Sequence, residues 1–145
     1  MSKTEDFLSK EAEQEIVHAI AEAEKNTSGE IRVHLEEKSE KQPLERAQEV
    51  FFELKMNQTE QRNGVLIYVC VADKKLAIIG DEGINNRVET DFWNCTKDII
   101  IENFKQNNFK KGLIEGILRA GERLKTHFPY LEKDENELSN EISRG

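Results

Sequence analysis

The sequence has few of the residues that usually mark a secreted, zinc-binding or cysteine-dependent protein. It contains two cysteines, three histidines and one tryptophan. It has no C-x-x-C and no H-E-x-x-H, so it carries neither of the common spacings of a zinc site. Cys70 and Cys95 both stand in apolar contexts. We therefore expect two buried free thiols rather than a disulfide or a metal centre.

Long hydrophobic runs are also missing. The longest apolar run, residues 65–72, has eight residues, whereas a helix needs about 20 to cross a bilayer. The first fifteen residues, MSKTEDFLSKEAEQE, lack the apolar centre of a signal peptide. We therefore expect no membrane span and a protein that is made and kept in the cytoplasm.

Positive charge is in deficit. Lys and Arg number 21 against 29 Asp and Glu, which gives a formal net charge of −8. This balance argues against nucleic acid as a partner, because phosphate backbones select basic surfaces. It argues equally against an anionic membrane surface. The length of 145 residues indicates one domain with one main core.

The hydrophobic pattern predicts alternating helices and strands. Ser9 is a plausible N-cap for the first helix, and Pro43 suits the first position of the second. The expected order is a helix from Ser9 to about residue 26, a strand over 30–37, a helix from Pro43, strands over 65–72 and 76–79, and helices over 92–107 and 110–128. This order predicts a small α/β domain with helices on both faces of a mixed sheet.

Polar residues gather at one predicted edge of that sheet. Residues 80–86, GDEGINN, are too polar and glycine-rich for a regular element, so we expect a shaped loop. A crossover makes the first two strands parallel and a hairpin makes the third antiparallel, which brings residues 28–30, 60–64 and 80–86 together. The carboxylate, amide and backbone carbonyl oxygens there would suit a hard cation such as calcium as ligands. Alternatively, Asp81 and the asparagines cap turns and the glutamates are solvated.

Three stretches of the chain carry a family resemblance. They are TSGEIRV at 27–33, RNGVLIYV at 62–69 and IIGDEGI at 78–84. In this order and spacing the chain resembles the TPM-domain family, which includes thylakoid-lumen phosphatase-like proteins, photosystem II repair proteins and many bacterial proteins of unassigned role. The resemblance covers residues 10–128. We expect a free-standing soluble form, with one TPM-like domain over 1–130 and an acidic tail over 131–145 that is mobile or weakly helical.

The resemblance implies an αβα sandwich around a mixed central sheet of about four strands. It also implies two crossing loops, near 62–63 and 80–86, that hold divalent metal ions, calcium first and magnesium second. The residues implied or suggested as ligands are Asp81, Asn63, Asn85, Glu82 and Glu30, with Asp91 as an outside candidate. Many relatives have an acidic residue where this chain has Arg62, so one possible ligand is replaced by a positive charge.

Three functions follow as expectations. The first is a divalent-metal binding domain whose ions order the crossing loops, acting as a metal-responsive binding or regulatory module for a protein partner or a phosphate-containing ligand. The second is a metal-dependent phosphatase or nucleotide phosphohydrolase, with Arg62 or Arg87 on the phosphate. The third is a protein-interaction domain without metal. No P-loop or catalytic cysteine loop is present, so the sequence leaves catalysis open.

Overall fold

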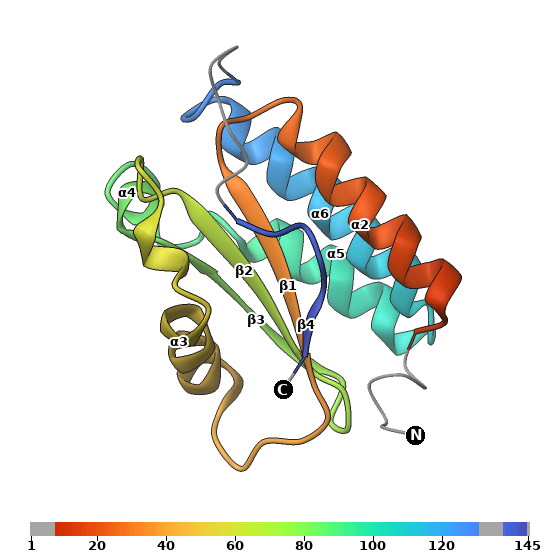
Figure 1. The fold of residues 1–145 in the computed structure, drawn as a ribbon. Helices are drawn as coiled ribbons and strands as arrows, with labels where there is room; N and C mark the ends of the chain where they lie inside the picture. Colours follow the sequence, from red (N-terminus) through yellow and green to blue (C-terminus); the bar gives the residue numbers. More distant parts are fainter. Residues whose placement is uncertain (1–7, 131–137, 145) are drawn as a thin grey trace.

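The computed structural model describes residues 8–130 and 138–144 as an α/β sandwich with an open four-stranded sheet (Figure 1). This architecture confirms the predicted fold class. In chain order, the described elements are α2 (Lys10–Glu24), β1 (Glu30–Glu36), α3 (Pro43–Glu53), the 3₁₀ turn η1 (Met56–Gln58), β2 (Gly64–Cys70), β3 (Lys75–Gly80), α4 (Glu82–Asn85), α5 (Asn94–Lys105), α6 (Phe109–Lys125) and β4 (Ser143–Arg144).

The sheet has the strand order β3-β2-β1-β4. β1 and β2 are parallel and β2 and β3 are antiparallel, as the crossover and the hairpin predicted. The fourth strand, β4, was not predicted as a strand. It comes from the segment expected to be a mobile or weakly helical tail, and it pairs in parallel with β1 at His34 and Leu35. Residues 131–137 and 145 of that tail lie outside the described residues.

Each face of the sheet carries its own core. Val33 and Ile67 belong to the larger core, which α2, α5 and α6 cover, whereas Tyr68 belongs to the smaller core beneath α3. Figure 1 shows α2, α5 and α6 on one side of the sheet and α3 on the other. The split follows from the period of two along a strand, which sends successive side chains to opposite faces.

Glycines allow α6 to approach its neighbours closely. A Cβ at Gly116 would lie 2.5 Å from the side chain of Ile100 on α5, and one at Gly121 would lie 2.8 Å from Cβ of Ala23 near the end of α2. α6 therefore packs closely against α5 and α2 at these glycines. Phe92 and Trp93 are buried just before α5 and belong to the larger core.

Two further expectations from the sequence are wrong. Residues 80–86 are not an irregular loop, because Asp81 caps the one-turn helix α4 by accepting a 2.7 Å hydrogen bond from the backbone nitrogen of Glu82. Cys95 is exposed rather than buried, since it lies on the outer side of α5 while Thr96 and Ile100 point inward. No helix in the described ranges is long and apolar enough to cross a membrane.

Candidate functional site

Two loops cross at the sheet edge where β2 begins and β3 ends. We call residues 59–64 and 81–86 the loop crossing. The backbone nitrogen of Gly83 donates to the carbonyl oxygen of Arg62 at 2.8 Å, and that of Asp81 donates to the carbonyl oxygen of Gly64 at 2.9 Å. A Cβ at Gly83 would lie 2.3 Å from the carbonyl oxygen of Gln61. The crossing therefore requires a residue without a side chain at position 83.

Arg62 and Asp81 form the charged centre of the loop crossing. The Nε and Nη2 atoms of Arg62 donate to the two carboxylate oxygens of Asp81 at 2.9 and 3.2 Å. A third group, the carboxylate of Glu82, lies 3.4 Å from the same guanidinium. The Asp81 side chain is only 5% exposed, whereas that of Arg62 is 41% exposed. Two carboxylates thus converge on one cationic group that reaches them from the solvent side.

Electrostatics and backbone geometry both hold Arg62 in this position. The hydrogen bonds to Asp81, together with the negative charges of Asp81 and Glu82, raise the pKa of the Arg62 guanidinium. Its backbone has a φ of 53°, in the left-handed region that non-glycine residues rarely adopt. This conformation turns the chain sharply just before β2 and directs the Arg62 side chain to Asp81.

The structure places the other predicted ligands around this centre in different ways. Asn63 is buried, and its backbone and side chain bond within the neighbouring loops. Asn85 donates its side-chain amide to the carbonyl oxygen of Gly80 at 3.0 Å. Glu30 is buried at the start of β1, where one of its oxygens accepts a 2.7 Å hydrogen bond from the backbone nitrogen of Leu138. Asp81 and Glu82 are therefore the two predicted ligands that meet at one point.

A hard cation would find a partial ligand set at this point. Among residues 8–130 and 138–144, no group of three or more His, Cys, Asp or Glu side chains is placed to hold a metal ion. Asp81 and Glu82 nevertheless supply two negative charges to one position, which the guanidinium of Arg62 occupies. Two carboxylates are fewer than the six to eight oxygen ligands of calcium, so a bound ion would have to displace Arg62 and take further ligands.

A cavity of about 410 Å³ adjoins the loop crossing. Its wall combines Arg62, Asp81 and Glu82 with apolar side chains of α3 and β3, including Phe52 and Ile79. Phe52 is 62% exposed, which is unusual for a large aromatic side chain. The charged centre therefore forms one wall of a partly apolar hollow.

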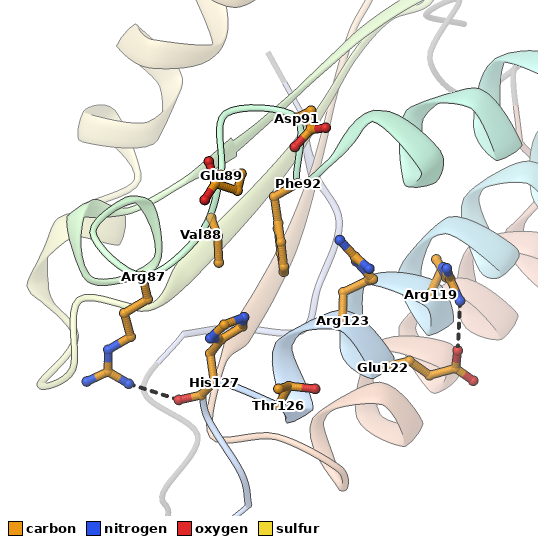
Figure 2. A pocket seen from close by; sticks show the side chains of 10 residues that line it. All are labelled: Arg87, Val88, Glu89, Asp91, Phe92, Arg119, Glu122, Arg123, Thr126 and His127. Atoms are coloured by element: carbon orange, nitrogen blue, oxygen red, sulfur yellow. Dashed lines mark hydrogen bonds and ion pairs between the residues drawn. The ribbon is translucent and has the colours of Figure 1, made fainter.

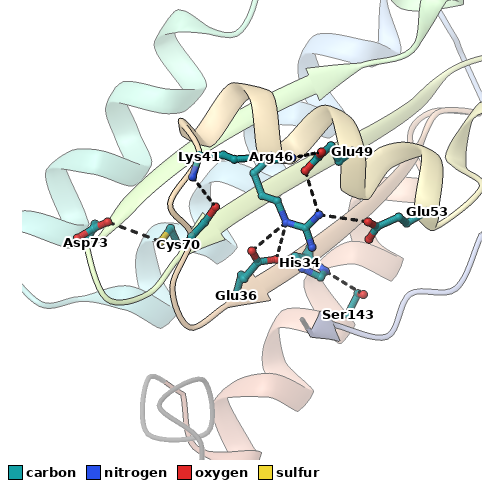
Figure 3. Close-up of polar contacts among 10 residues, drawn as sticks. His34, Glu36, Lys41, Arg46, Glu49, Glu53, Cys70, Asp73 and Ser143 are labelled. Atoms are coloured by element: carbon teal, nitrogen blue, oxygen red, sulfur yellow. Dashed lines mark hydrogen bonds and ion pairs between the residues drawn. The ribbon is translucent and has the colours of Figure 1, made fainter.

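A second polar cluster was missed by the sequence reasoning (Figure 3). His34 and Glu36 alternate with apolar side chains along β1, and both are buried beneath α3. The Nε2 atom of His34 lies 3.2 Å from Glu36 and its Nδ1 atom lies 3.0 Å from the hydroxyl of Ser143 on β4. Arg46 of α3 donates to both carboxylate oxygens of Glu36 at 2.9 and 3.1 Å.

Burial and pairing set the protonation of this cluster. Burial lowers the pKa of His34, and this effect outweighs the opposing hydrogen bond and charge of Glu36. Burial alone would raise the pKa of Glu36, but the hydrogen bonds from Arg46 and His34 lower it overall. A neutral His34 that donates from Nε2 to Glu36 and accepts from Ser143 at Nδ1 satisfies all three groups. The cluster thereby links β1, α3 and β4.

Comparison with known proteins places the chain in a family. The family model of the TPM domain matches residues 1–123. The chain belongs to the TPM-domain family. No curated protein sequence matches it. The TPM assignment confirms the resemblance carried by the three motifs.

Solved structures agree with this TPM assignment. The NMR structure of the BA42 protein from the psychrophilic bacterium Bizionia argentinensis is 55% identical, covers 100% of both chains and superposes with a TM-score of 0.92. The solution structure of an N-terminal domain from P. gingivalis is 16% identical, covers 87% of this chain and 83% of that one, and gives a TM-score of 0.70. The second likeness concerns the fold of the TPM domain alone.

Proposed function

We propose that this TPM domain binds a divalent cation, calcium in preference to magnesium, at the loop crossing, and that the ion orders the two loops. One observation carries the proposal. The carboxylates of Asp81 and Glu82 converge on the guanidinium of Arg62, 2.9 and 3.4 Å from its nitrogens. Arg62 thus takes the place of a cation, and its exposed side chain can swing into solvent when a divalent ion binds.

The protein groups have separate tasks in this proposal. Asp81 and Glu82 would provide the negative charge, while the carbonyl oxygens of the tightly crossed backbones offer neutral ligands nearby. The bound ion would supply a double positive charge that cross-links the loops. Because Arg62 competes for the same carboxylates, calcium affinity would be lower than in a domain with a neutral residue at position 62.

A regulatory role follows from the neighbouring cavity. Release of Arg62 from Asp81 would change the wall that these residues share with Phe52 and Ile79. We therefore propose that metal binding alters what this hollow accepts, which is the behaviour of a metal-responsive binding module. Hydrolysis of a phosphate ester remains a prediction, since Arg62 and Arg87 both hold contacts within the chain. A cytoplasmic location also remains a prediction.

Thermal melts of chelator-stripped protein at fixed ionic strength test the proposal. Calcium should raise the melting temperature more than magnesium, with about 2.7 kcal/mol of stabilisation at a hundredfold excess over Kd. Arg62→Gln removes the competing cation and should tighten calcium binding. Asp81→Asn keeps an oxygen that can cap α4 but removes the charge, and it should abolish the calcium response.

Asp73→Asn is the matched control, because it removes an exposed carboxylate from the turn between β2 and β3 at the opposite end of the sheet. Its calcium response should equal that of the wild type. A calcium shift that survives Asp81→Asn, or that weakens in Arg62→Gln, would contradict the proposed site. In the same samples, chelator-sensitive turnover of a phosphate ester would establish the enzymatic alternative.

A further inference from the structure

A second cavity lies between residues 87–92 and the last turns of α6 (Figure 2). It measures about 650 Å³, and three of the chain's seven arginines line it. They are Arg87, Arg119 and Arg123. We call this cavity, which Phe92 and His127 also line, the arginine pocket. In a protein with a net charge of −8, three guanidinium groups around one cavity indicate a candidate site for an anion.

Arg123 is held by an aromatic ring rather than by a carboxylate. Its guanidinium carbon lies 4.7 Å from the centroid of the Phe92 ring, and its Nε is buried with no hydrogen-bond partner among the described residues. The face of an aromatic ring attracts a cation without neutralising it. Phe92 therefore leaves the positive charge of Arg123 in place beside the cavity.

Arg119 lies one turn before Arg123 on α6, so the two side chains project from the same side of the helix. Its Nε is likewise buried without a hydrogen-bond partner in the described part of the chain. The ion pair with Glu122 is 3.6 Å long, beyond hydrogen-bond distance, and the Glu122 side chain is 68% exposed. Glu122 can therefore give way when an anion approaches Arg119.

The remaining wall of the pocket is fixed by contacts within the protein. Arg87 donates to the carbonyl oxygen of His127 at 2.9 Å and lies over the ring of Phe128 at 4.4 Å. The His127 ring meets Phe92 edge-on at a centroid distance of 5.8 Å. Contacts within the protein thus already hold the aromatic side chains in place. Binding of an anionic ligand would not have to restrict their motion.

The acidic residues at the rim restrict the size of the ligand. Glu89, Asp91 and Glu122 are exposed and match the three arginines in number. A long polyanion would meet these carboxylates, whereas a compact anion would reach the arginines alone. The pocket therefore suits one small anionic group with a short organic part.

We propose that the arginine pocket binds a small ligand with one phosphate or carboxylate group. Arg119 and Arg123 contact the anionic group, because guanidinium forks match the geometry of both oxyanions. Phe92 and Val88 pack against the organic part. The proposal does not depend on metal binding at the loop crossing, from which it differs in every residue.

NMR titration of ¹⁵N-labelled protein that has been stripped of divalent ions and then dialysed free of chelator tests this inference. Sodium phosphate and, separately, sodium acetate replace sodium chloride at constant ionic strength. At least one anion should produce saturable shifts of the Nε–Hε signals of Arg119 and Arg123. Arg123→Gln should weaken binding by about tenfold, as expected for loss of a charge-assisted contact. Lys125→Gln removes an equal charge from an exposed position on the same helix and should leave the affinity within about twofold.

Arg119→Gln provides a second test that spares the contact between Arg123 and Phe92, and it should also weaken binding about tenfold. Saturation by phosphate alone would assign a phosphate ligand, and saturation by acetate alone a carboxylate ligand. Shifts that rise linearly with both anions, or an affinity that neither arginine variant changes, would overturn the inference. Because the divalent ions have been removed beforehand, failure here is distinct from failure of the calcium proposal.

Discussion

The backbone nitrogen of Gly83 hydrogen-bonds to the carbonyl oxygen of Arg62 across the loop crossing, at 2.8 Å. Gly83 lies in the first turn of α4, and Arg62 lies in the left-handed turn before β2. Arg62 thus makes both the backbone contact with Gly83 and the charge contact with Asp81. The geometry of the charged centre therefore depends on the absence of a side chain at position 83.

Gly83→Ala should be strongly destabilising. The added methyl group would lie 2.3 and 2.5 Å from the carbonyl oxygens of Gln61 and Arg62, and backbone atoms cannot move aside as a flexible side chain can. Overpacking of this kind costs about 1–3 kcal/mol. Urea unfolding gives the free energy directly. Gly80→Ala is the control, because its new methyl group would meet the Ile84 side chain at 3.2 Å and should cost less. Equal losses would contradict the crossing geometry.

Glu24→Gln should stabilise the protein at neutral pH. Burial raises the pKa of Glu24 to about 7, the negative charge of Glu30 adds to this rise, and the hydrogen bond from the backbone nitrogen of Ile31 opposes it. Since the folded pKa lies above the unfolded value of 4.5, stability is full below pH 4.5 and falls as pH rises through 7. Glutamine keeps an acceptor for Ile31 without the buried charge.

The gain from Glu24→Gln at pH 8 should be at most about 3 kcal/mol, from 1.36 kcal/mol per pKa unit. Unfolding curves of both proteins at pH 8 and pH 4.5 test the sign, since the difference should shrink toward zero at the lower pH. Glu11→Gln, on the exposed side of the same helix, is the control and should show little pH-dependent difference. A gain that is independent of pH would exclude a buried carboxylate as the cause.

His34 should make the fold less stable in mild acid. Burial lowers its pKa below the usual 6.5, so the unfolded chain takes up a proton at a higher pH than the folded chain does. The contribution of neutral His34 is therefore present above pH 6.5 and is lost as pH falls through 6.5 toward the folded pKa. The fall in unfolding free energy between pH 7.5 and 5.5 should be smaller in His34→Gln than in the wild type. His18→Gln, at a site 77% exposed, should retain the wild-type slope.

The two thiols should differ in reactivity. Cys95 is exposed on α5 and should react with a thiol reagent such as DTNB in the native state, whereas Cys70 is buried in β2 and should react only after unfolding. Counting released thiolate before and after addition of denaturant measures both. Cys95→Ser should leave a native protein without a fast-reacting thiol, and a fast phase in that variant would show that Cys70 is accessible.

The regular elements were predictable because their hydrophobic patterns extend over many residues. The continuous apolar run at 65–72 predicted a strand, which is buried along its whole length, and the crossover argument predicted that β1 and β2 are parallel. β4 was not predictable in this way, because a strand of two residues has no period. Its pairing depends on tertiary contacts such as that between Ser143 and His34.

The site was predictable as a region but not as a set of contacts. Strand direction was sufficient to bring residues 60–64 and 80–86 to one edge. Spacing did not indicate that Arg62 would bind Asp81, nor that Glu30 would turn to Leu138. The sequence did not distinguish Arg119 and Arg123 from the other charged residues of α6. The cavity beside them is formed with residues 87–92, which lie about thirty positions earlier in the chain.

The pairing of β4 with β1 also bears on self-association. Without Ser143 and Arg144, the backbone groups of β1 near His34 and Leu35 would form an open edge of the sheet. Unpaired strand edges recruit strands from other molecules. β4 therefore occupies this part of the β1 edge and prevents it from pairing with a strand of another molecule. Variants that lose the contact between Ser143 and His34 are the ones in which aggregation should first appear.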